Sequence, residues 1–200
     1  MIEKSEHEFL IKGIGVIRSC YSEKFGIPRQ AGLVESSLAT LCLNSPYNRP
    51  EMIMGLEQFS HIWVFFIFHA TVKEGWKATV RPPGLGGQKR VGVFASRSPH
   101  RPNHIGSSAV RLLGIDRQDN TTCLSLGGGD FLDGTVVIDI KPYLPYSDAL
   151  DGAKTGYGNG GLKIENIAFS SESLLFCQRY FERTGRDLHL LIEQTLRQDP

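Results

Sequence analysis

The 200-residue sequence predicts a mainly β (α+β) fold, a single antiparallel or mixed β-barrel followed by two helices. Short apolar runs recur along the first two thirds of the chain, with Gly, Pro, Asn and Asp between them. No long amphipathic helix separates these runs, so the crossover helices that a parallel sheet requires are missing. Helical patterns appear only near the C-terminus. This order favours a barrel over a Rossmann sheet.

Several apolar segments have the residue types of β-strands. Segment 62–68 is apolar throughout, which is typical of a central strand buried on both faces. Segment 9–17 is β-branched and interrupted by glycines, and a short helical turn is expected over 50–56. The expected strands are 9–17, 40–43, 62–68, 91–95, 108–115, 121–126 and 135–140.

The C-terminal part predicts a pair of helices. Ser170 is a plausible N-cap before an apolar stripe that ends at Thr184-Gly185, and a second stripe begins at Leu188. We expect an αα-hairpin packed on the barrel, which divides the chain into a barrel domain, 1–165, and a helical hairpin, 166–200. The glycine-rich stretch 151–161 is expected to be a surface connection, with a lid as the alternative.

Composition places the chain among ordinary globular proteins, with 40% hydrophobic and 22% charged residues. The first residues show no signal-peptide pattern, and the longest apolar run is too short to cross a bilayer, so a cytoplasmic location and no membrane partner are expected. The four cysteines form no C-x-x-C pair. We therefore expect no metal site and no disulfide framework, but buried or half-buried thiols.

Charge is distributed unevenly although the net charge is only +1. Segment 73–117 contains nine basic and two acidic residues, 9 − 2 = +7, so the remainder carries 1 − 7 = −6. A basic zone on a nearly neutral protein suits a polyanionic partner met at one face. The alternative is a solvated loop region with interleaved charges.

The most informative segment is 97–106, Arg-Ser-Pro-His-Arg-Pro-Asn-His-Ile-Gly. Pro99 and Pro102 stiffen its backbone. Two arginines, an asparagine and two histidines supply hydrogen-bond donors on that frame. Since the expected strand 91–95 precedes it, we expect this loop to lie at a sheet end and to bind a ligand.

Other candidate clusters carry polar groups beside glycine or proline. They are 25–30, Phe68-His69, 80–87, and 127–135 with the sequence Gly-Gly-Gly-Asp-Phe-Leu-Asp-Gly-Thr. Two of these clusters also have a purely structural interpretation. His69 could be a hydrogen-bonded core residue, and Asp133-Gly134 could be a simple turn between two strands. No phosphate-binding P-loop, G-x-S-x-G or H-E-x-x-H motif occurs, which argues against kinases, common hydrolases and zinc proteases.

Taken in order, several strings resemble the TsaA-like (YaeB, TrmO) family. The most specific are 97–106, Leu-Asp-Gly-Thr at 132–135 and Asp-Ile-Lys-Pro-Tyr-Leu-Pro at 139–145. The segments 14–19, 28–30 and 55–63 also resemble the family in the same order, so that the likeness covers about residues 8 to 200.

The resemblance implies a β-barrel methyltransferase that uses S-adenosylmethionine and is a homodimer, with 1–165 as its cofactor-binding domain. Its implied substrate is a tRNA, methylated at N6 of threonylcarbamoyl-adenosine adjacent to the anticodon. The cofactor-binding residues would then be Pro28, Arg29, Gln30, His69, Arg97, Ser107, Gly127, Gly128, Gly129, Asp130, Asp133, Gly134 and Thr135.

Methyl transfer to an acylated nitrogen requires a proton acceptor. Asp133 is our first choice for this catalytic base and Asp130 the second. Arginine pairs with carboxylate and phosphate, so Arg97 is expected to face the cofactor and Arg101 the RNA. The other expected substrate-binding residues are Asn103, Lys141 and Tyr143.

Two departures from the family pattern stand out. His104 replaces the usual proline, and the chain ends at Pro200 where longer members continue into a small C-terminal domain, which we expect to be absent.

Two other functions are left open by the residues. One is a β-barrel methyltransferase of a small molecule, and the other is a non-catalytic RNA-binding barrel.

Overall fold

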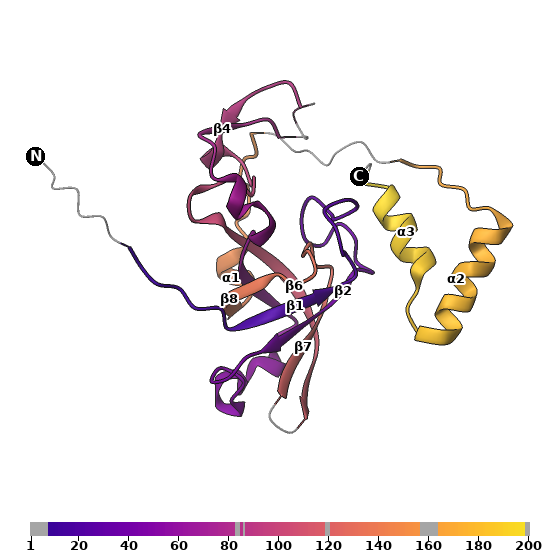
Figure 1. Ribbon diagram of the computed structural model, residues 1–200, viewed down its shortest axis with the longest axis horizontal. Helices are drawn as coiled ribbons and strands as arrows, with labels where there is room; N and C mark the ends of the chain where they lie inside the picture. Colours follow the sequence, from indigo (N-terminus) through magenta and orange to yellow (C-terminus); the bar gives the residue numbers. More distant parts are fainter. Residues whose placement is uncertain (1–7, 83–84, 86, 119–120, 157–163, 199–200) are drawn as a thin grey trace, which may run out of the picture.

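A closed six-stranded antiparallel barrel forms the body of the protein (Figure 1). The computed structural model describes residues 8–82, 85, 87–118, 121–156 and 164–198. The strands follow one another around the barrel in the order β1-β2-β7-β6-β3-β8. Their bounds are β1 Gly15–Ser19, β2 Leu38–Leu43, β3 His61–Ile67, β6 Ile105–Gln118, β7 Thr121–Gly127 and β8 Val136–Pro142. The predicted barrel is therefore confirmed, and every pairing in it is antiparallel.

Alternate side chains of each strand point into the barrel, and together they form the hydrophobic core. In β3, Ile62, Val64 and Phe66 point inward and are buried, whereas Trp63 and Phe65 are partly exposed on the outside. The apolar run is thus a half-buried strand rather than one buried on both faces. Its outer aromatic residues are available to line a surface cavity.

Two expected strands are shorter than the sequence suggested. Residues 9–14 precede β1 without forming strand, although the Ile14 N–H donates to Val137 O over 2.8 Å. In 91–95 only Val91–Gly92 (β5) is strand, and it pairs with Thr79–Val80 (β4) in a small separate sheet. The chain then turns through a 3-10 helix, Val93–Ala95. The loop 97–106 is consequently anchored to the barrel at its other end, where β6 begins.

Short helical turns fill the connections between strands. The turn expected over 50–56 forms as Pro50–Ile53, followed by Leu56–Gln58. After β3 the chain enters a 3-10 helix, His69–Glu74, and a further one, Pro102–His104, precedes β6. A single helical turn, α1 (Pro145–Asp148), follows β8. These turns bring the polar loops to the barrel rim.

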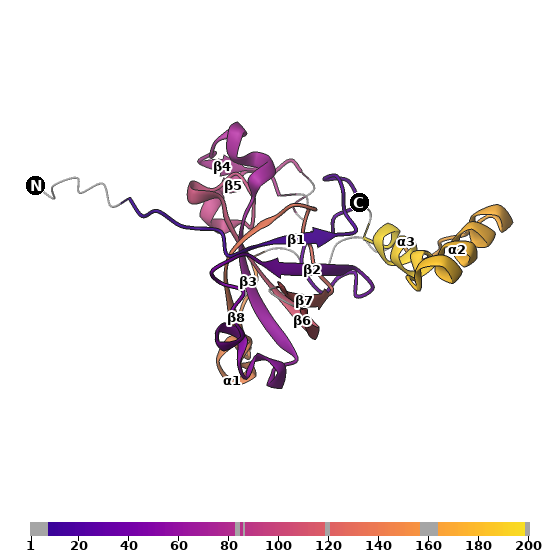
Figure 2. The same ribbon diagram turned by 60° about the horizontal axis from the view of Figure 1, so that its bottom comes forward.

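The expected helical hairpin forms as α2 (Ser171–Thr184) and α3 (Leu188–Leu196). Ser170 caps α2 by accepting from the Ser173 N–H, and Gly185 ends it with a left-handed φ of 69°. The hairpin is attached through α3 to the β1–β2 connection, and α2 lies farther from the barrel (Figures 1 and 2). Among the described residues, no helix is long and apolar enough to span a membrane.

The expectation of four buried or half-buried thiols is wrong for three cysteines. Cys42 on β2 and Cys123 on β7 are cross-strand neighbours and form a disulfide. Cys20 is a free and exposed thiol, and Cys177 is free and buried. The two bridged residues are 81 positions apart, so only the pairing register of the strands brings them together.

Candidate functional site

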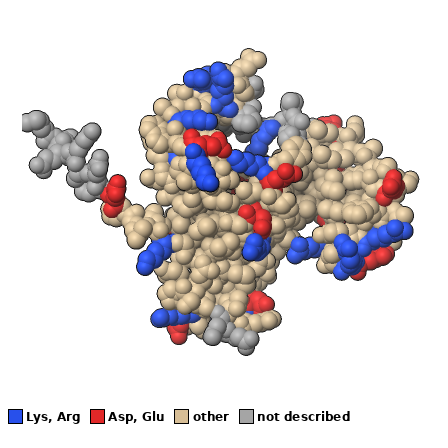
Figure 3. All heavy atoms as spheres, viewed as in Figure 1, with Lys and Arg blue, Asp and Glu red and all other residues tan. Residues whose placement is uncertain are grey.

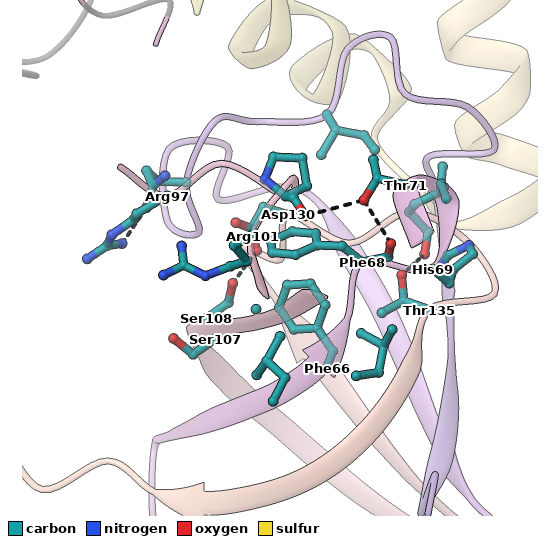
Figure 4. A pocket seen from close by; sticks show the side chains of 18 of the residues that line it. Phe66, Phe68, His69, Thr71, Arg97, Arg101, Ser107, Ser108, Asp130 and Thr135 are labelled. Carbon is teal, nitrogen blue, oxygen red and sulfur yellow. Dashed lines mark hydrogen bonds between the residues drawn. The ribbon is translucent and has the colours of Figure 1, made fainter. Parts of the chain in front are cut away.

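A cavity of about 620 Å³ lies where β3 ends and β6 begins, and residues from both faces of these two strands line it. Three connections surround it: the β1–β2 loop around 24–30, the turn His69–Glu74, and the loop 96–101. In Figure 4, Arg97 and Arg101 enter from one side and His69 and Thr71 from the other. The volume lies within the range of small-molecule and cofactor sites.

One wall of the cavity is aromatic. The rings of Phe66 and Phe68 meet edge to face with 5.1 Å between centroids, and Phe66 meets Phe131 at 5.2 Å. Gly106 on β6 makes this wall possible, because a Cβ at that position would lie 2.5 Å from Phe66 Cζ. Phe66 is only 4% exposed and fixes the wall from behind, so the partly exposed Phe68 ring provides its apolar surface for a flat ligand group.

Three arginines, Arg29, Arg97 and Arg101, also line the cavity. The Arg97 guanidinium donates to Gln30 Oε1, which links the two polar loops on either side of the cavity. Arg101 Nη1 donates to Ser96 O over 3.1 Å. Guanidinium groups held in this way are pre-oriented for a carboxylate or a phosphate.

Asp130 lies at the base of the cavity and is largely buried. Ser108 Oγ donates to its Oδ1 over 2.6 Å. Burial raises the pKa of Asp130, while hydrogen bonds from Ser108 and the backbone and the charge of Arg97 lower it. Among the lining residues that the structure describes, Asp130 is the only carboxylate.

Asp133 has different neighbours from those expected of a base. Its carboxylate accepts from the Ser19 N–H at 2.9 Å and from Arg18 Nη1 at 3.3 Å, and it does not line the cavity. The next residue, Gly134, has a φ of 79° and donates its N–H to Ile17 O. Asp133-Gly134 is thus a turn that is hydrogen-bonded to the end of β1. This agrees with the structural interpretation of the dipeptide, a simple turn between strands.

The glycine run also supports structure next to the cavity. Gly128, with a φ of 73°, donates to Ser37 O and accepts from the Gly32 N–H, each at 2.8 Å. Gly129 O accepts from Ser37 Oγ over 2.8 Å. These bonds hold the β1–β2 connection, which presents Pro28 and Gln30. Gly127, Gly128, Gly129 and Gly134 do not line the cavity themselves.

The remaining predicted residues divide into two groups. Those in the cavity lining are Pro28, Arg29, Gln30, His69, Arg97, Arg101, Ser107, Asp130 and Thr135. Asn103 lies outside it, in a left-handed turn with a φ of 66°. Lys141 stands over the Phe65 ring at 5.5 Å, and the Tyr143 ring lies 5.9 Å from that of Trp63. These two contact lining residues from outside.

Sequence reasoning missed several side chains that shape the site. Ser108 is one, and Thr71 is another, whose hydroxyl lies 3.0 Å from Phe68 O and 3.4 Å from Pro99 O. Glu74 binds Lys24 Nζ at 3.1 Å and His100 Nε2 at 2.8 Å, so it joins three connections at the cavity mouth. His100 and Lys24 lower the pKa of Glu74 to about 2. Nothing local in the sequence marks Thr71 or Glu74, because their partners are distant along the chain.

Residues 16–149 match the family model described as the tRNA-methyltransferase O N-terminal domain. The match covers most of the barrel and every loop around the cavity. The chain belongs to the TrmO family. The resemblance seen in the sequence motifs is therefore confirmed.

Members of the TrmO family share both sequence and architecture with this chain. A tRNA (adenine(37)-N6)-methyltransferase of Escherichia coli (strain K12) is 45% identical over 196 residues, which cover 96% of this chain and 82% of that protein. A putative S-adenosylmethionine-dependent methyltransferase of Pseudomonas aeruginosa is 44% identical over 95% of this chain and 80% of the relative. The crystal structure of TrmO from Pseudomonas aeruginosa superimposes with a TM-score of 0.80 at 39% identity, covering 97% of this chain and 82% of that one.

The TrmO family comprises enzymes, so the prediction of a methyltransferase barrel rather than a Rossmann fold is confirmed. The described residues contain no group of three or more His, Cys, Asp or Glu side chains arranged to hold a metal ion.

Proposed function

We propose that this protein transfers a methyl group from S-adenosylmethionine to N6 of threonylcarbamoyl-adenosine, next to the anticodon of a tRNA. The observation that carries the proposal is one cavity that combines an aromatic wall, three arginines and, among the described lining residues, a single carboxylate. The E. coli relative, named as a tRNA (adenine(37)-N6)-methyltransferase, supports the reaction and the position of the target.

The residues present fit S-adenosylmethionine. Its adenine would lie against Phe68, which Phe66 supports from behind, and its carboxylate would pair with Arg97, which Gln30 already orients. The other cofactor-binding residues that we propose are Pro28, Arg29, His69, Ser107 and Thr135, which all line the same cavity. When bound, this cofactor supplies a methyl group that is already activated on sulfur.

The chain itself must remove a proton and hold the target nitrogen. The lone pair of N6 is delocalised into its carbonyl substituent, so loss of the N6 proton makes the nitrogen a better nucleophile. We assign proton acceptance to Asp130 instead of Asp133, because Asp130 lies in the cavity and Asp133 is engaged with Arg18 and Ser19. Arg101 would hold the threonyl carboxylate, and the surrounding loops would exclude water.

Paired variants test these assignments. We expect Asp130→Asn to reduce methylation by about 100-fold or more, the range in which a general base contributes. Asp133→Asn is expected to lower stability and keep most of the turnover of the folded enzyme. The measurement is mass spectrometry of nucleosides from tRNA incubated with labelled cofactor. Near-normal turnover of Asp130→Asn would contradict the assignment of the base.

A tRNA is the macromolecular partner that this reaction requires, and the basic residues between 73 and 117 support it. We also propose a homodimer in the cytoplasm, as the family resemblance implies. Sedimentation of the purified protein over a range of concentrations tests the dimer. If bulk tRNA fails to receive methyl groups while a small molecule does, the substrate class is wrong.

A further inference from the structure

Three large aromatic side chains are exposed beside the mouth of the cavity. Phe25 is 72% exposed, Trp76 63% and Phe94 80%. They come from three separate connections of the chain. Burial is the usual fate of such side chains, so a group of exposed ones indicates a binding surface.

Backbone pairing places Trp76 and Phe94 near each other, and a side-chain ion pair connects the segment of Phe25 to that of Trp76. Val93 donates its N–H to Ala78 O over 3.0 Å, next to the β4–β5 pairing, so Trp76 and Phe94 lie at the same end of that ladder. Phe25 follows Lys24, whose ammonium group binds Glu74, two residues before Trp76. Trp76 and Phe94 thus lie on one side of the Lys24–Glu74 ion pair, and Phe25 lies on the other side, where it lines a small hollow with Thr195 of α3. We call these three residues the aromatic rim.

The aromatic rim adjoins the cavity directly. Lys24 and Ile27, on either side of Phe25, line the cavity, and so do Ser96 and Arg97, which follow Phe94. A target base inserted into the cavity would leave the neighbouring nucleotides of its strand at this rim.

Positive charge surrounds the aromatic rim. Between residues 73 and 101 the chain has seven Lys or Arg and one acidic residue, Glu74. The Glu74 carboxylate is already paired with Lys24 and His100. Several blue side chains gather at the top of Figure 3, where Figure 1 places β4. Protein–protein interfaces are instead depleted in lysine, so the charge favours a polyanion as the occupant.

We propose that Phe25, Trp76 and Phe94 form a stacking platform for unpaired bases that flank the methylated adenosine in the RNA loop. This inference rests on the proposed function and adds to it the residues that bind the flanking bases. Single-stranded loops are recognised by stacking unstacked bases on aromatic rings while basic groups neutralise the phosphates. The rim provides both features beside the reaction site.

The test compares Trp76→Ala, Phe94→Ala and Phe25→Ala with the unchanged protein. Binding of an anticodon stem-loop RNA is measured by fluorescence anisotropy at several salt concentrations. Each substitution is expected to weaken binding by about 5- to 100-fold, the usual effect of losing one base–aromatic stack. The slope of affinity against salt should stay the same, because no phosphate contact is removed. Cofactor affinity, measured by calorimetry, should also be unchanged.

Two control variants accompany these measurements. Trp76→Phe keeps a ring and should retain most of the RNA affinity. Tyr146→Ala removes a side chain that is 86% exposed on α1, at the end of the molecule opposite β4 in Figure 2, and should leave RNA binding unchanged. Equal losses in Tyr146→Ala and Trp76→Ala would overturn the proposal.

The outcomes separate this inference from the proposed function. If the protein binds the stem-loop but methylates no tRNA, the proposed reaction fails while the RNA-binding comparison still decides the role of the rim. If all three alanine variants bind RNA as tightly as the unchanged protein, the stacking platform is overturned. If they change the sedimentation of the protein instead, the rim is an interface between proteins and the proposal is wrong.

Discussion

Asp130 shows how a single hydrogen bond adjusts the pKa of a buried carboxyl group. Burial makes the carboxylate hard to ionise, and the 2.6 Å bond from Ser108 Oγ compensates for part of that cost. A base must be ionised to accept a proton, so the methylation rate should fall as the pH drops through the raised pKa of Asp130.

We expect Ser108→Ala to shift the acid limb of the pH–rate profile to higher pH. The substitution removes a donor that stabilises the ionised carboxylate, and the pKa therefore rises further from its ordinary value. Activity should recover at high pH, where Asp130 is ionised in both proteins. Rates measured from pH 5 to 9 under single-turnover conditions provide the check. An unmoved acid limb would mean that Asp130 does not control the rate.

A substitution at Gly106 is expected to affect both stability and cofactor binding. A methyl group there would lie 2.5 Å from Phe66 Cζ and 2.8 Å from Phe68 Cζ, and the Phe66 ring cannot retreat because it is buried against Phe131. We expect Gly106→Ala to cost about 1–3 kcal/mol in the free energy of unfolding, as overpacked cores do, and to weaken cofactor binding.

Gly114→Ala is the matched control for that substitution. It lies on the same strand, β6, and an added Cβ there would meet nothing within 4 Å. Urea denaturation of both variants gives the two free energies. Similar losses for Gly106→Ala and Gly114→Ala would refute the steric explanation.

At the scale of elements, α3 is connected to the cavity through one loop. Gln194 Oε1 accepts from the Ser36 N–H at 2.9 Å and from Ser36 Oγ at 2.7 Å, and Gln198 Nε2 donates to Leu33 O at 3.4 Å. The same β1–β2 connection presents Pro28 and Gln30 to the cavity. The hairpin can therefore influence ligand binding without touching the ligand.

We expect Gln194→Ala to raise the Kd for S-adenosylmethionine several-fold and to leave kcat at saturating cofactor nearly unchanged. Two hydrogen bonds are lost, worth about 1–2 kcal/mol together, and part of this energy orders the loop before the ligand arrives. Calorimetry gives the Kd. Gln178→Ala on α2 serves as the control, because the Gln178 amide donates to Glu182 on the same helix and not to the β1–β2 connection. A loss of kcat without a change in Kd would contradict a role in loop ordering.

At the scale of the whole molecule, the barrel is closed by strand pairing and cross-linked once, between Cys42 on β2 and Cys123 on β7. The two cysteines are 81 positions apart in the sequence, and β3 and the whole of β6 lie between them. A cross-link of this kind lowers the conformational entropy of the unfolded chain more than that of the folded chain, and it therefore stabilises the fold.

Reduction of this disulfide is expected to lower the free energy of unfolding by about 2–4 kcal/mol, the typical contribution of a bridge. The double variant Cys42→Ser, Cys123→Ser should be destabilised to a similar extent. Thermal unfolding with and without dithiothreitol measures the effect. The reductant should not affect the double variant, and a drop in its Tm would trace the effect to something other than the bridge.

The sequence by itself determined most of the elements and which loops carry the polar groups that line the cavity. Short apolar runs between turn residues specify strands, the Ser170 cap and Gly185 delimit α2, and two prolines mark 97–106 as a stiff polar loop. Local periodicity and capping act over a few residues, which is why these features can be recognised without tertiary structure.

Tertiary structure alone decided which groups face one another. The sequence favoured Asp133 as the base, yet the turn directs Asp133 to Arg18 and leaves Asp130 beside Ser108 in the cavity. Likewise, the register of β2 against β7 paired Cys42 with Cys123. A one-residue change of register reverses the face that a side chain occupies, and that register depends on the closure of the whole barrel.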